Sequence, residues 1–292
     1  MRVVAVVLSW NGREDTLACL ESLRGLETVV VDNGSSDGSA EAVAERFPEV
    51  VLIRAGVNLG FAAGNNVGIR RALDLGADWI VLVNNDSTVA DDLAAELTAA
   101  AGRNPGAGVL AGKLYVADPP DVLWYAGGSF EPRLGYSGRV RGAGKRDDGS
   151  YGDELDVDWG SGALLGVSRE AIERAGLLDE ELFAYMEDVD WCLRIRDAGL
   201  RVVFVPSLRA WHRVSASTGG AASTTSIYYH CRNTLAVCER RRPLARGHTG
   251  VRRAIVVGTH LLQALRHPTR RRAAWAALRA WRDYRRGRMG RR

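Results

Sequence analysis

Residues 79–86 read WIVLVNND, an apolar run that ends in two amides and a carboxylate. A near-continuous apolar run of this kind is typical of a strand that is buried in a parallel sheet. The strand is expected over Trp79–Val83, with Asn84, Asn85 and Asp86 at its carboxyl end. The stretch therefore predicts a polar site at one edge of a buried sheet.

Three further apolar runs lie upstream and alternate with segments of helical spacing. In Arg13–Arg24, for example, leucines recur at positions that share one helix face. Alternating strands and helices predict a parallel, doubly wound α/β sheet, whose ligands bind beyond the carboxyl ends of the strands. The expected strands are Val3–Leu8, Thr28–Val31, Val50–Ile53 and Trp79–Val83, and the expected helices are Arg13–Arg24, Ala40–Arg46 and Gly60–Leu75.

Polar residues follow each of these four strands. Ser9 and Asn11 come after the first strand, Asp32 after the second and Asn58 after the third. Because parallel strands end at one edge of their sheet, we expect these side chains to lie at the same edge as Asp86.

The loop of residues 32–39, DNGSSDGS, separates this chain from several nucleotide-binding classes. It lacks the glycine patterns of dinucleotide-binding and P-loop proteins, which disfavours a dehydrogenase or a P-loop enzyme. A nucleotidyltransferase would need a glycine-rich, lysine-bearing loop after the first strand, and residues 9–12 contain no lysine.

The second half of the chain has a different pattern. Residues 107–167 combine many glycines with short apolar runs, which predicts mixed or antiparallel strands and long loops, including a mobile excursion over residues 138–153. A strand over Arg201–Val205 is expected to stop at Pro206. The other expected elements are strands at Val109–Leu114, Leu123–Tyr125 and Ala163–Val167 and a helix at Asp188–Asp197.

Two carboxylates are candidates for chemistry. Asp86 at a strand end could coordinate Mg²⁺ or Mn²⁺ while diphosphate oxygens take other positions, although Asn and Asp are also common in capping turns. Asp188 follows Glu187 at the start of a helix and could accept a proton from an acceptor hydroxyl. The alternative for these two acids is a favourable interaction with the helix dipole.

Two further segments are weaker candidates. His212 closes a strand-like segment, and a lone histidine needs other ligands before it can hold a metal. Trp159, Gly160 and Ser161 form a turn that enters an apolar strand, where glycine permits a close backbone approach. The alternative there is a simple turn.

The net charge of +4 is unevenly distributed. Residues 240–292 contain 17 arginines, no lysine and one acid, so that this segment carries +16 and the preceding residues carry −12. Two helices are expected, at residues 251–266 and 273–286, and the second combines Trp, Leu and Arg as interfacial helices do. Contact with an anionic membrane, docking on the acidic body and a solvated end are the alternatives. No nucleic-acid module accompanies the arginines, so specific nucleic-acid binding is not expected.

The cysteines and the hydropathy of the chain indicate in which cellular compartment the protein is expected. The four cysteines show no metal-ligand spacing and are expected to be reduced thiols of a cytosolic protein. No apolar run reaches the roughly 18 residues of a membrane span, and the first apolar run is too short for a signal peptide.

Seven motifs in this order resemble the family 2 glycosyltransferases, and within them the bacterial rhamnosyltransferase-like group. The resemblance covers about residues 1–235. The motifs are VVLSWNG (6–12), VVDNGSSDGS (30–39), NLGFAAGNN (58–66), WIVLVNNDS (79–87), WGSGALL (159–165), YMEDVDWCL (185–193) and WHRVSAS (211–217).

The resemblance implies a Rossmann-like nucleotide-diphosphosugar transferase fold, called GT-A, with a mixed central sheet. It also implies an inverting mechanism and a divalent metal. The fold is expected over residues 1–235, and a basic helical extension over residues 236–292. The chain departs from the family's metal-binding DxD motif because Asn84 replaces the first acid. Donor diphosphate must then supply more of the metal's ligands.

The resemblance also assigns roles by motif. Asp188 matches the catalytic base, Asp86 the last acid of the DxD motif and His212 a metal-proximal histidine. Asp32 is expected at the nucleotide base or ribose. The remaining donor-side residues are Ser9, Asn11, Asn58, Asn65, Asn84 and Asn85, and the acceptor-side residues are Trp159, Gly160, Ser161 and Glu187.

The expected activity is sugar transfer from a nucleotide-sugar donor to an acceptor hydroxyl. By resemblance the donor is dTDP-rhamnose, with UDP- and GDP-sugars as alternatives. The acceptor is a polysaccharide intermediate, a lipid-linked saccharide or a small natural product, and the enzyme is expected in the cytoplasm or peripherally at the inner face of the cell membrane. The rival hypothesis is a noncatalytic nucleotide-sugar-binding protein.

Overall fold

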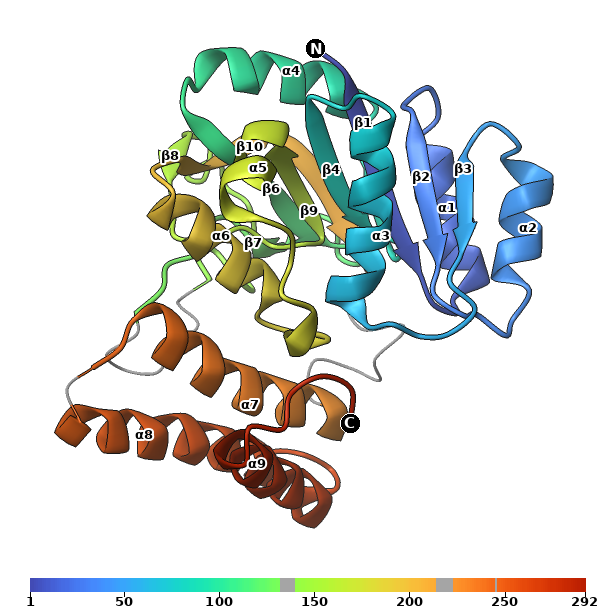
Figure 1. Ribbon diagram of the computed structural model, residues 1–292. Coiled ribbons are helices and arrows are strands. Elements are labelled where there is room, and N and C mark those ends of the chain that lie inside the picture. Colours follow the sequence, from blue (N-terminus) through green and yellow to red (C-terminus); the bar gives the residue numbers. More distant parts are fainter. Residues whose placement is uncertain (132–139, 214–222, 245) are drawn as a thin grey trace.

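The computed structural model describes residues 1–131, 140–213, 223–244 and 246–292. Within these ranges one ten-stranded sheet forms the body, in the order β3-β2-β1-β4-β9-β6-β10-β5, with β7 beside β6 and β8 beside β10 (Figure 1). The strands are β1 (Val3–Ser9), β2 (Thr28–Asp32), β3 (Val51–Arg54), β4 (Trp79–Asn84), β5 (Ser87–Val89), β6 (Ala107–Val116), β7 (Leu123–Tyr125), β8 (Leu155–Asp156), β9 (Leu164–Ser168) and β10 (Arg201–His212).

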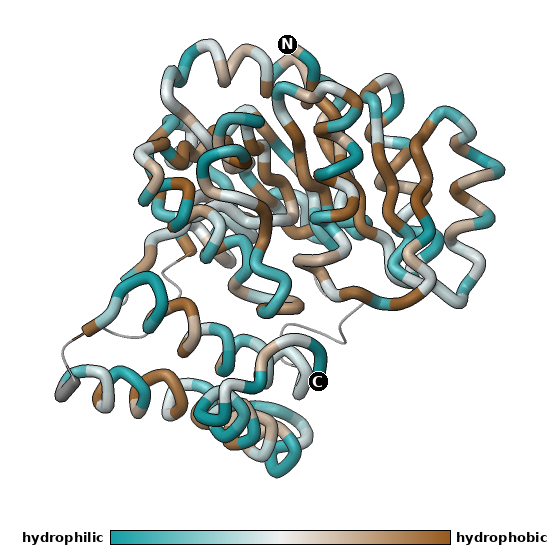
Figure 2. The backbone as a smooth tube through the Cα atoms, viewed as in Figure 1, coloured by the Kyte–Doolittle hydropathy of each residue, from teal (hydrophilic) through white to brown (hydrophobic). Residues whose placement is uncertain are grey.

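Helices and loops surround this sheet and extend away from it. The body carries α1 (Arg13–Ser22), α2 (Ser39–Arg46), α3 (Phe61–Asp74), α4 (Leu93–Arg103), α5 (Arg169–Ala175), the short 3-10 helix η2 (Glu180–Leu182) and α6 (Glu187–Asp197). Figure 2 shows that the strands are the most hydrophobic part of the body.

The strands β1 to β4 are parallel, as the alternating pattern predicts. The apolar residues of β2 and β4 and nearly all of those of β1 are buried, whereas those of the edge strand β3 are partly buried. Helix α3 packs closely on β1 because its glycines leave room. A Cβ atom on Gly64 would lie 2.5 Å from the Leu8 side chain, and one on Gly68 would lie 2.4 Å from Val6. Close packing of α3 places its first residues beside the carboxyl ends of β1 and β2.

The other half of the sheet is mixed, which confirms that prediction. β9 runs antiparallel between β4 and β6, and β10 pairs parallel with β6 and antiparallel with β5. The expected stop at Pro206 is wrong, because β10 continues to His212. Its pairing with β6 shifts between Val205 and Arg209, and such an irregularity lets a strand pass a residue that cannot donate a backbone hydrogen bond.

Three helices form a separate layer below the body: α7 (Thr224–Arg241), α8 (Arg246–Leu265) and α9 (Arg270–Arg285) (Figure 1). Their facing side chains form a second hydrophobic cluster, which includes Tyr228, Cys231 and Leu235 of α7. The division predicted between residues 235 and 236 falls inside α7, a continuous helix. Within the described residues, no helix is long and apolar enough to cross a membrane.

Arginines at the end of α7 attach this layer to acids of the body. Arg240 lies 2.9 Å from Asp179, and Arg241 lies 2.6 Å from a buried oxygen of Asp190. Arg242 makes a further pair with Asp197 at 3.1 Å. The basic segment therefore docks partly on the acidic body, one of the alternatives that its charge left open.

Candidate active site

The carboxyl ends of β1, β2 and β4 bring the predicted polar residues to one edge. Ser9 is paired with Asp32 in the β1–β2 register, and Leu8 is paired with Asn84 across β1 and β4. Ser9 is buried and bonds to the Thr16 hydroxyl at 2.9 Å. Asp32 is also buried, and its carboxylate receives only long contacts of 3.4 Å from the Ser35 amide. Asp32 therefore keeps most of its acceptor capacity for a ligand.

Asp86 and His212 meet because β5 and β10 pair antiparallel. The pairing sets His212 opposite Ser87, the residue after Asp86. The Nε2 atom of His212 lies 2.9 Å from Oδ1 of Asp86, and Nδ2 of Asn84 lies 3.4 Å from the same nitrogen. The imidazole also packs edge-on against Trp124 at 4.9 Å between ring centroids. Two residues that are 126 positions apart in the sequence thus form one polar pair.

This pair fits a divalent cation. Both side chains are buried, and within the described ranges Nδ1 of His212 has no hydrogen-bond partner, while Oδ1 of Asp86 has the imidazole beside it and no hydrogen-bond donor in good geometry. Two ligands of an octahedral ion at about 2.1 Å are about 3 Å apart, close to the separation of Oδ1 and Nε2. Among the described residues no group of three or more His, Cys, Asp or Glu gathers to hold a metal. A cation here would therefore take other ligands from the donor or from water.

Asp188 lies in the first turn of α6. Its Oδ2 accepts the Gly162 amide at 3.1 Å, and its Oδ1 accepts the Val189 amide at 2.8 Å. Desolvation raises the pKa of Asp188, and the two amide hydrogen bonds oppose that rise. A carboxylate with a raised pKa is a stronger base, so this position suits proton acceptance.

The neighbouring acids of α6 differ from Asp188. Burial, together with the charge of Asp188, raises the pKa of Glu187 well above the ordinary range, and its Oε2 has no hydrogen-bond partner in the part of the chain that the structure describes. Asp190 is buried between Arg194 at 2.8 Å and Arg241 at 2.6 Å. Asp190 is thus a structural anchor for α7, whereas Glu187 lies next to the candidate base.

Most of the predicted donor-side amides serve the local backbone. Asn58 accepts hydrogen bonds from Asn33 at 3.2 Å and from the Gly60 amide at 2.8 Å. Asn65 donates to the Phe61 carbonyl inside α3. Asn11 has a left-handed backbone and accepts from the Ser36 amide, and Asn85 donates to the Thr16 hydroxyl. These residues shape the loops at the edge.

The predicted acceptor-side turn is tightly packed. Trp159 is buried and donates to the Ser129 carbonyl, and a Cβ on Gly160 would lie 2.4 Å from Leu165. Ser161 is buried and accepts from the Ala163 amide at 3.3 Å. The turn supports Gly162, whose amide binds Asp188. The motif was recognised from its sequence, but the Gly162 amide was not among the predicted site residues.

The last residues of the WHRVSAS motif, 215–217, lie outside the described residues, as do residues 138 and 139 of the predicted excursion. The described part of that excursion is anchored. Asp147 binds the buried Lys113 at 2.8 Å and the Tyr115 hydroxyl at 2.7 Å.

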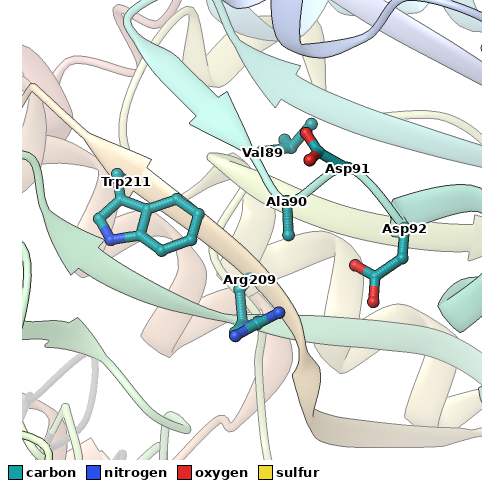
Figure 3. A pocket seen from close by; sticks show the side chains of 6 residues that line it. All are labelled: Val89, Ala90, Asp91, Asp92, Arg209 and Trp211. Atoms are coloured by element: carbon teal, nitrogen blue, oxygen red, sulfur yellow. The ribbon is translucent and has the colours of Figure 1, made fainter.

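A hollow of about 420 Å³ opens beside the end of β5 and is separate from the predicted site. Figure 3 shows Arg209 and Trp211 on β10 facing Asp91 and Asp92, which follow β5. None of the predicted catalytic, donor or metal residues lines it. It is therefore not the expected donor pocket.

The fold and the edge residues define a glycosyltransferase of the GT-A class that uses a nucleotide sugar. The mannosyltransferase PcManGT from Pyrobaculum calidifontis, solved in complex with GDP-Man and Mn²⁺, superposes with a TM-score of 0.57. The two chains are 20% identical, and the alignment covers 96% of this chain and 73% of that one. At this identity the likeness establishes the fold.

The model of glycosyl transferase family 2 matches residues 4–169, so the chain belongs to this family, within its rhamnosyltransferase-like group. The N-acetylglucosaminyl-diphospho-decaprenol L-rhamnosyltransferase of Mycobacterium tuberculosis is 29% identical, in an alignment that covers 85% of this chain and 88% of that protein. The dTDP-rhamnosyl transferase RfbF of Shigella flexneri is 28% identical, covering 73% of this chain and 69% of RfbF. The predicted family is confirmed.

Proposed function

We propose that the enzyme transfers a rhamnosyl group from dTDP-rhamnose to an acceptor hydroxyl with inversion. One connection between the two halves of the site carries this proposal. The backbone amide of Gly162 donates to Asp188. The backbone carbonyl of the next residue, Ala163, accepts a hydrogen bond from the backbone amide of Asn84 at 3.3 Å. Two consecutive residues of one turn thus join the candidate base to the start of the Asn84–Asp86 motif.

The reaction needs a new bond between the acceptor oxygen and the anomeric carbon. As this bond forms, the bond from that carbon to the diphosphate oxygen breaks and its electron pair leaves with the nucleoside diphosphate. Asp188 accepts the hydroxyl proton, and attack from the face opposite the leaving group inverts the configuration. Asp32 holds the base or ribose of the nucleotide through its free acceptor capacity.

Asp86 and His212 would hold Mg²⁺ or Mn²⁺ in this enzyme. The 2.9 Å separation of Oδ1 of Asp86 from Nε2 of His212, in a buried position, supports this assignment. When bound, the ion supplies charge that stabilises the leaving diphosphate. With Asn84 in place of an acid, the donor diphosphate would complete more of its coordination.

The relatives' names favour a lipid-linked acceptor over a small natural product. The Mycobacterium tuberculosis relative is named for a decaprenol-linked substrate and aligns over most of both chains. A saccharide on a polyprenyl diphosphate would place the reaction at a membrane surface, in the synthesis of cell-envelope polysaccharide or glycoconjugate.

Donor identity can be tested by thermal stability and turnover. With Mn²⁺ present, dTDP-rhamnose is expected to raise Tm more than UDP- or GDP-sugars, because a ligand at 100 times its Kd stabilises the folded state by about 2.7 kcal/mol. Release of dTDP, with and without a polyprenyl-linked acceptor, separates an enzyme from a noncatalytic binding protein. Binding without any release would contradict catalysis, and a larger shift with another nucleotide sugar would contradict the proposed donor.

We also propose that α8 and α9 contact an anionic membrane. Besides Val251 near the start of α8, four large apolar side chains are exposed there, and Trp275 on α9 is 71% exposed. Arginines at the α8–α9 junction, residues 266 and 270–272, are exposed and form no ion pair with an acid of the described chain. Exposed apolar residues beside unpaired arginines suit an interface of anionic headgroups. The apolar residues are Leu262, Leu265, Trp275 and Leu278.

Vesicle co-sedimentation tests this surface. The full chain is expected to bind phosphatidylglycerol vesicles and not phosphatidylcholine vesicles. Replacing Trp275 and Leu278 by Ser should weaken binding about ten-fold, because partial burial of two large apolar side chains is lost. Val57→Ser, at an exposed position of the body, is the matched control. Equal binding by the two variants would contradict a membrane role for α9.

A further inference from the structure

The segment that leads into the catalytic helix has an unusual backbone. Phe183, Tyr185 and Met186 all have positive φ angles, between 66° and 72°, and none of them is glycine. Each such residue costs about 1–3 kcal/mol and persists only where its surroundings hold it in place. Glu187 and Asp188 follow at once, so these contacts also determine where the candidate base lies.

The carbonyl groups of residues 181–185 show what holds the segment. Each of these five consecutive carbonyls accepts a hydrogen bond from a group outside the segment. The Phe183 carbonyl accepts the first amides of α3, from Phe61 at 2.6 Å and Ala62 at 3.2 Å. The other four carbonyls accept hydrogen bonds from two adjacent side chains of α7.

Those two side chains are Asn233 and Arg232. The Asn233 amide donates to the carbonyls of Leu182, Ala184 and Tyr185 at 2.9, 2.9 and 2.7 Å. Its oxygen accepts from Nε of Arg232 at 2.9 Å, which orients the amide so that its hydrogens face the segment.

Arg232 reinforces the same contact. Its guanidinium donates to the carbonyls of Leu182 at 3.0 Å and Glu181 at 3.4 Å, and it lies over the Tyr229 ring at 4.9 Å. Arg232 is 1% exposed and Asn233 is fully buried, and burial of such polar groups is costly unless they are hydrogen-bonded. The structure thus places a buried charge and a buried amide of α7 against backbone carbonyls.

We propose that Asn233, oriented by Arg232, is a positioning residue for the transfer reaction. The pair holds the backbone of residues 182–186, in which three residues have positive φ angles, and thereby sets Asp188 against the Gly162 amide. The same segment binds the start of α3 through Phe183, so α7 sets the distance between the acid and the donor edge. This inference rests on the proposed role of Asp188 as the base.

Asn233→Ala tests the proposal against Asn104→Ala. Asn104 is a buried asparagine that donates to the Ala100 carbonyl and to Glu154 and lies outside α6 and α7. Both variants therefore remove a buried, hydrogen-bonded amide, and their effects on stability should be comparable. Asn233→Ala is expected to lower kcat about 10²-fold, as a displacement of about 1 Å can, with donor Kd changed less than about three-fold. The control should keep kcat within about three-fold, and both variants should lower Tm to a similar extent.

A second variant and a second measurement cover the case in which Asn233→Ala fails to fold. Arg232→Lys keeps the charge but loses the planar fork, and we expect kcat to fall about ten-fold. In either Arg232 or Asn233 variant, hydrogen exchange should accelerate at residues 183–190 and at the first amides of α3. Unchanged exchange, or equal kcat in Asn233→Ala and the control, would overturn the proposal. A different outcome is normal turnover in Asp188→Asn, together with accelerated exchange and low kcat in Asn233→Ala. That outcome would overturn the assignment of Asp188 as the base, but the positioning role of Asn233 would stand.

Discussion

Asp188→Asn is expected to lower turnover by about 10²–10⁴-fold while donor affinity changes little, because general base assistance contributes about this factor. Asparagine keeps the shape of the side chain, and its single oxygen can still accept one of the two amides, that of Gly162 or that of Val189. It cannot take a proton from the acceptor hydroxyl. The measurement is kcat for transfer, with the donor Kd determined separately by calorimetry.

The pH dependence of the wild-type enzyme provides a second test of the role of Asp188. Burial raises the pKa of Asp188, so activity should fall as pH decreases through a value above the ordinary carboxyl range. The same shift means that the folded protein binds this proton more tightly than the unfolded chain does. Stability from this group is present at low pH and is lost as pH rises through the raised pKa. Asp188→Asn removes this titration, so the Tm of the variant should change less between low and neutral pH than that of the wild type.

Asp197→Asn is the matched control, because Asp197 ends the same helix and pairs with Arg242 on an exposed surface. Exposed pairs contribute about 0–1 kcal/mol, so both activity and Tm should stay close to wild type. Near-normal turnover in Asp188→Asn would refute the assignment of the base. A comparable activity loss in both variants would refute a specific role for this carboxylate.

The first half of the fold could be predicted because its information is local. The runs before Ser9, Asp32 and Asn84 are apolar enough to indicate buried strands, and their order implies parallel pairing. The same logic placed the polar residues at one edge. It could not separate Asp86, whose carboxylate faces His212, from Asn85, whose amide donates to Thr16, because that difference depends on the direction of each side chain.

The pairing of Asp86 with His212 is not local information. It depends on β5, a strand of three residues, and on β10 continuing past Pro206. A proline predicts the end of a strand when only neighbouring residues are considered. The shifted register with β6 lets the strand continue, and that register is a property of the assembled sheet.

Helix α7 was not predicted because its buried face is partly polar. Arg232 and Asn233 occupy positions that helical periodicity would assign to apolar residues, so the pattern of residues 224–241 is weak. Their burial is explained by residues about fifty positions earlier, whose backbone carbonyls accept their hydrogen bonds. Departures from a local pattern are expected where a chain supports a functional site.

Asp86→Ala is expected to remove the metal dependence of donor binding. The proposed site has one carboxylate and one imidazole from the chain, so loss of Asp86 leaves only His212 beside the neutral Asn84. We expect dTDP-rhamnose affinity in the presence of Mn²⁺ to fall about 10²-fold, equivalent to about 2.7 kcal/mol. Calorimetry with Mn²⁺ and with a chelator should then give nearly equal affinities for the variant.

Two further variants make the metal assignment specific. Asp91→Ala removes an exposed acid five residues away that lines the separate hollow, and it should leave the effect of Mn²⁺ unchanged. Asn84→Asp adds a carboxylate where Nδ2 of Asn84 now lies 3.4 Å from His212, and should tighten Mn²⁺ binding because hard cations prefer anionic oxygen ligands. Calorimetric titration of Mn²⁺ alone measures this gain without any dependence on turnover. If Asp86→Ala keeps its full response to Mn²⁺ and Asn84→Asp gains none, the cation does not bind between Asp86 and His212.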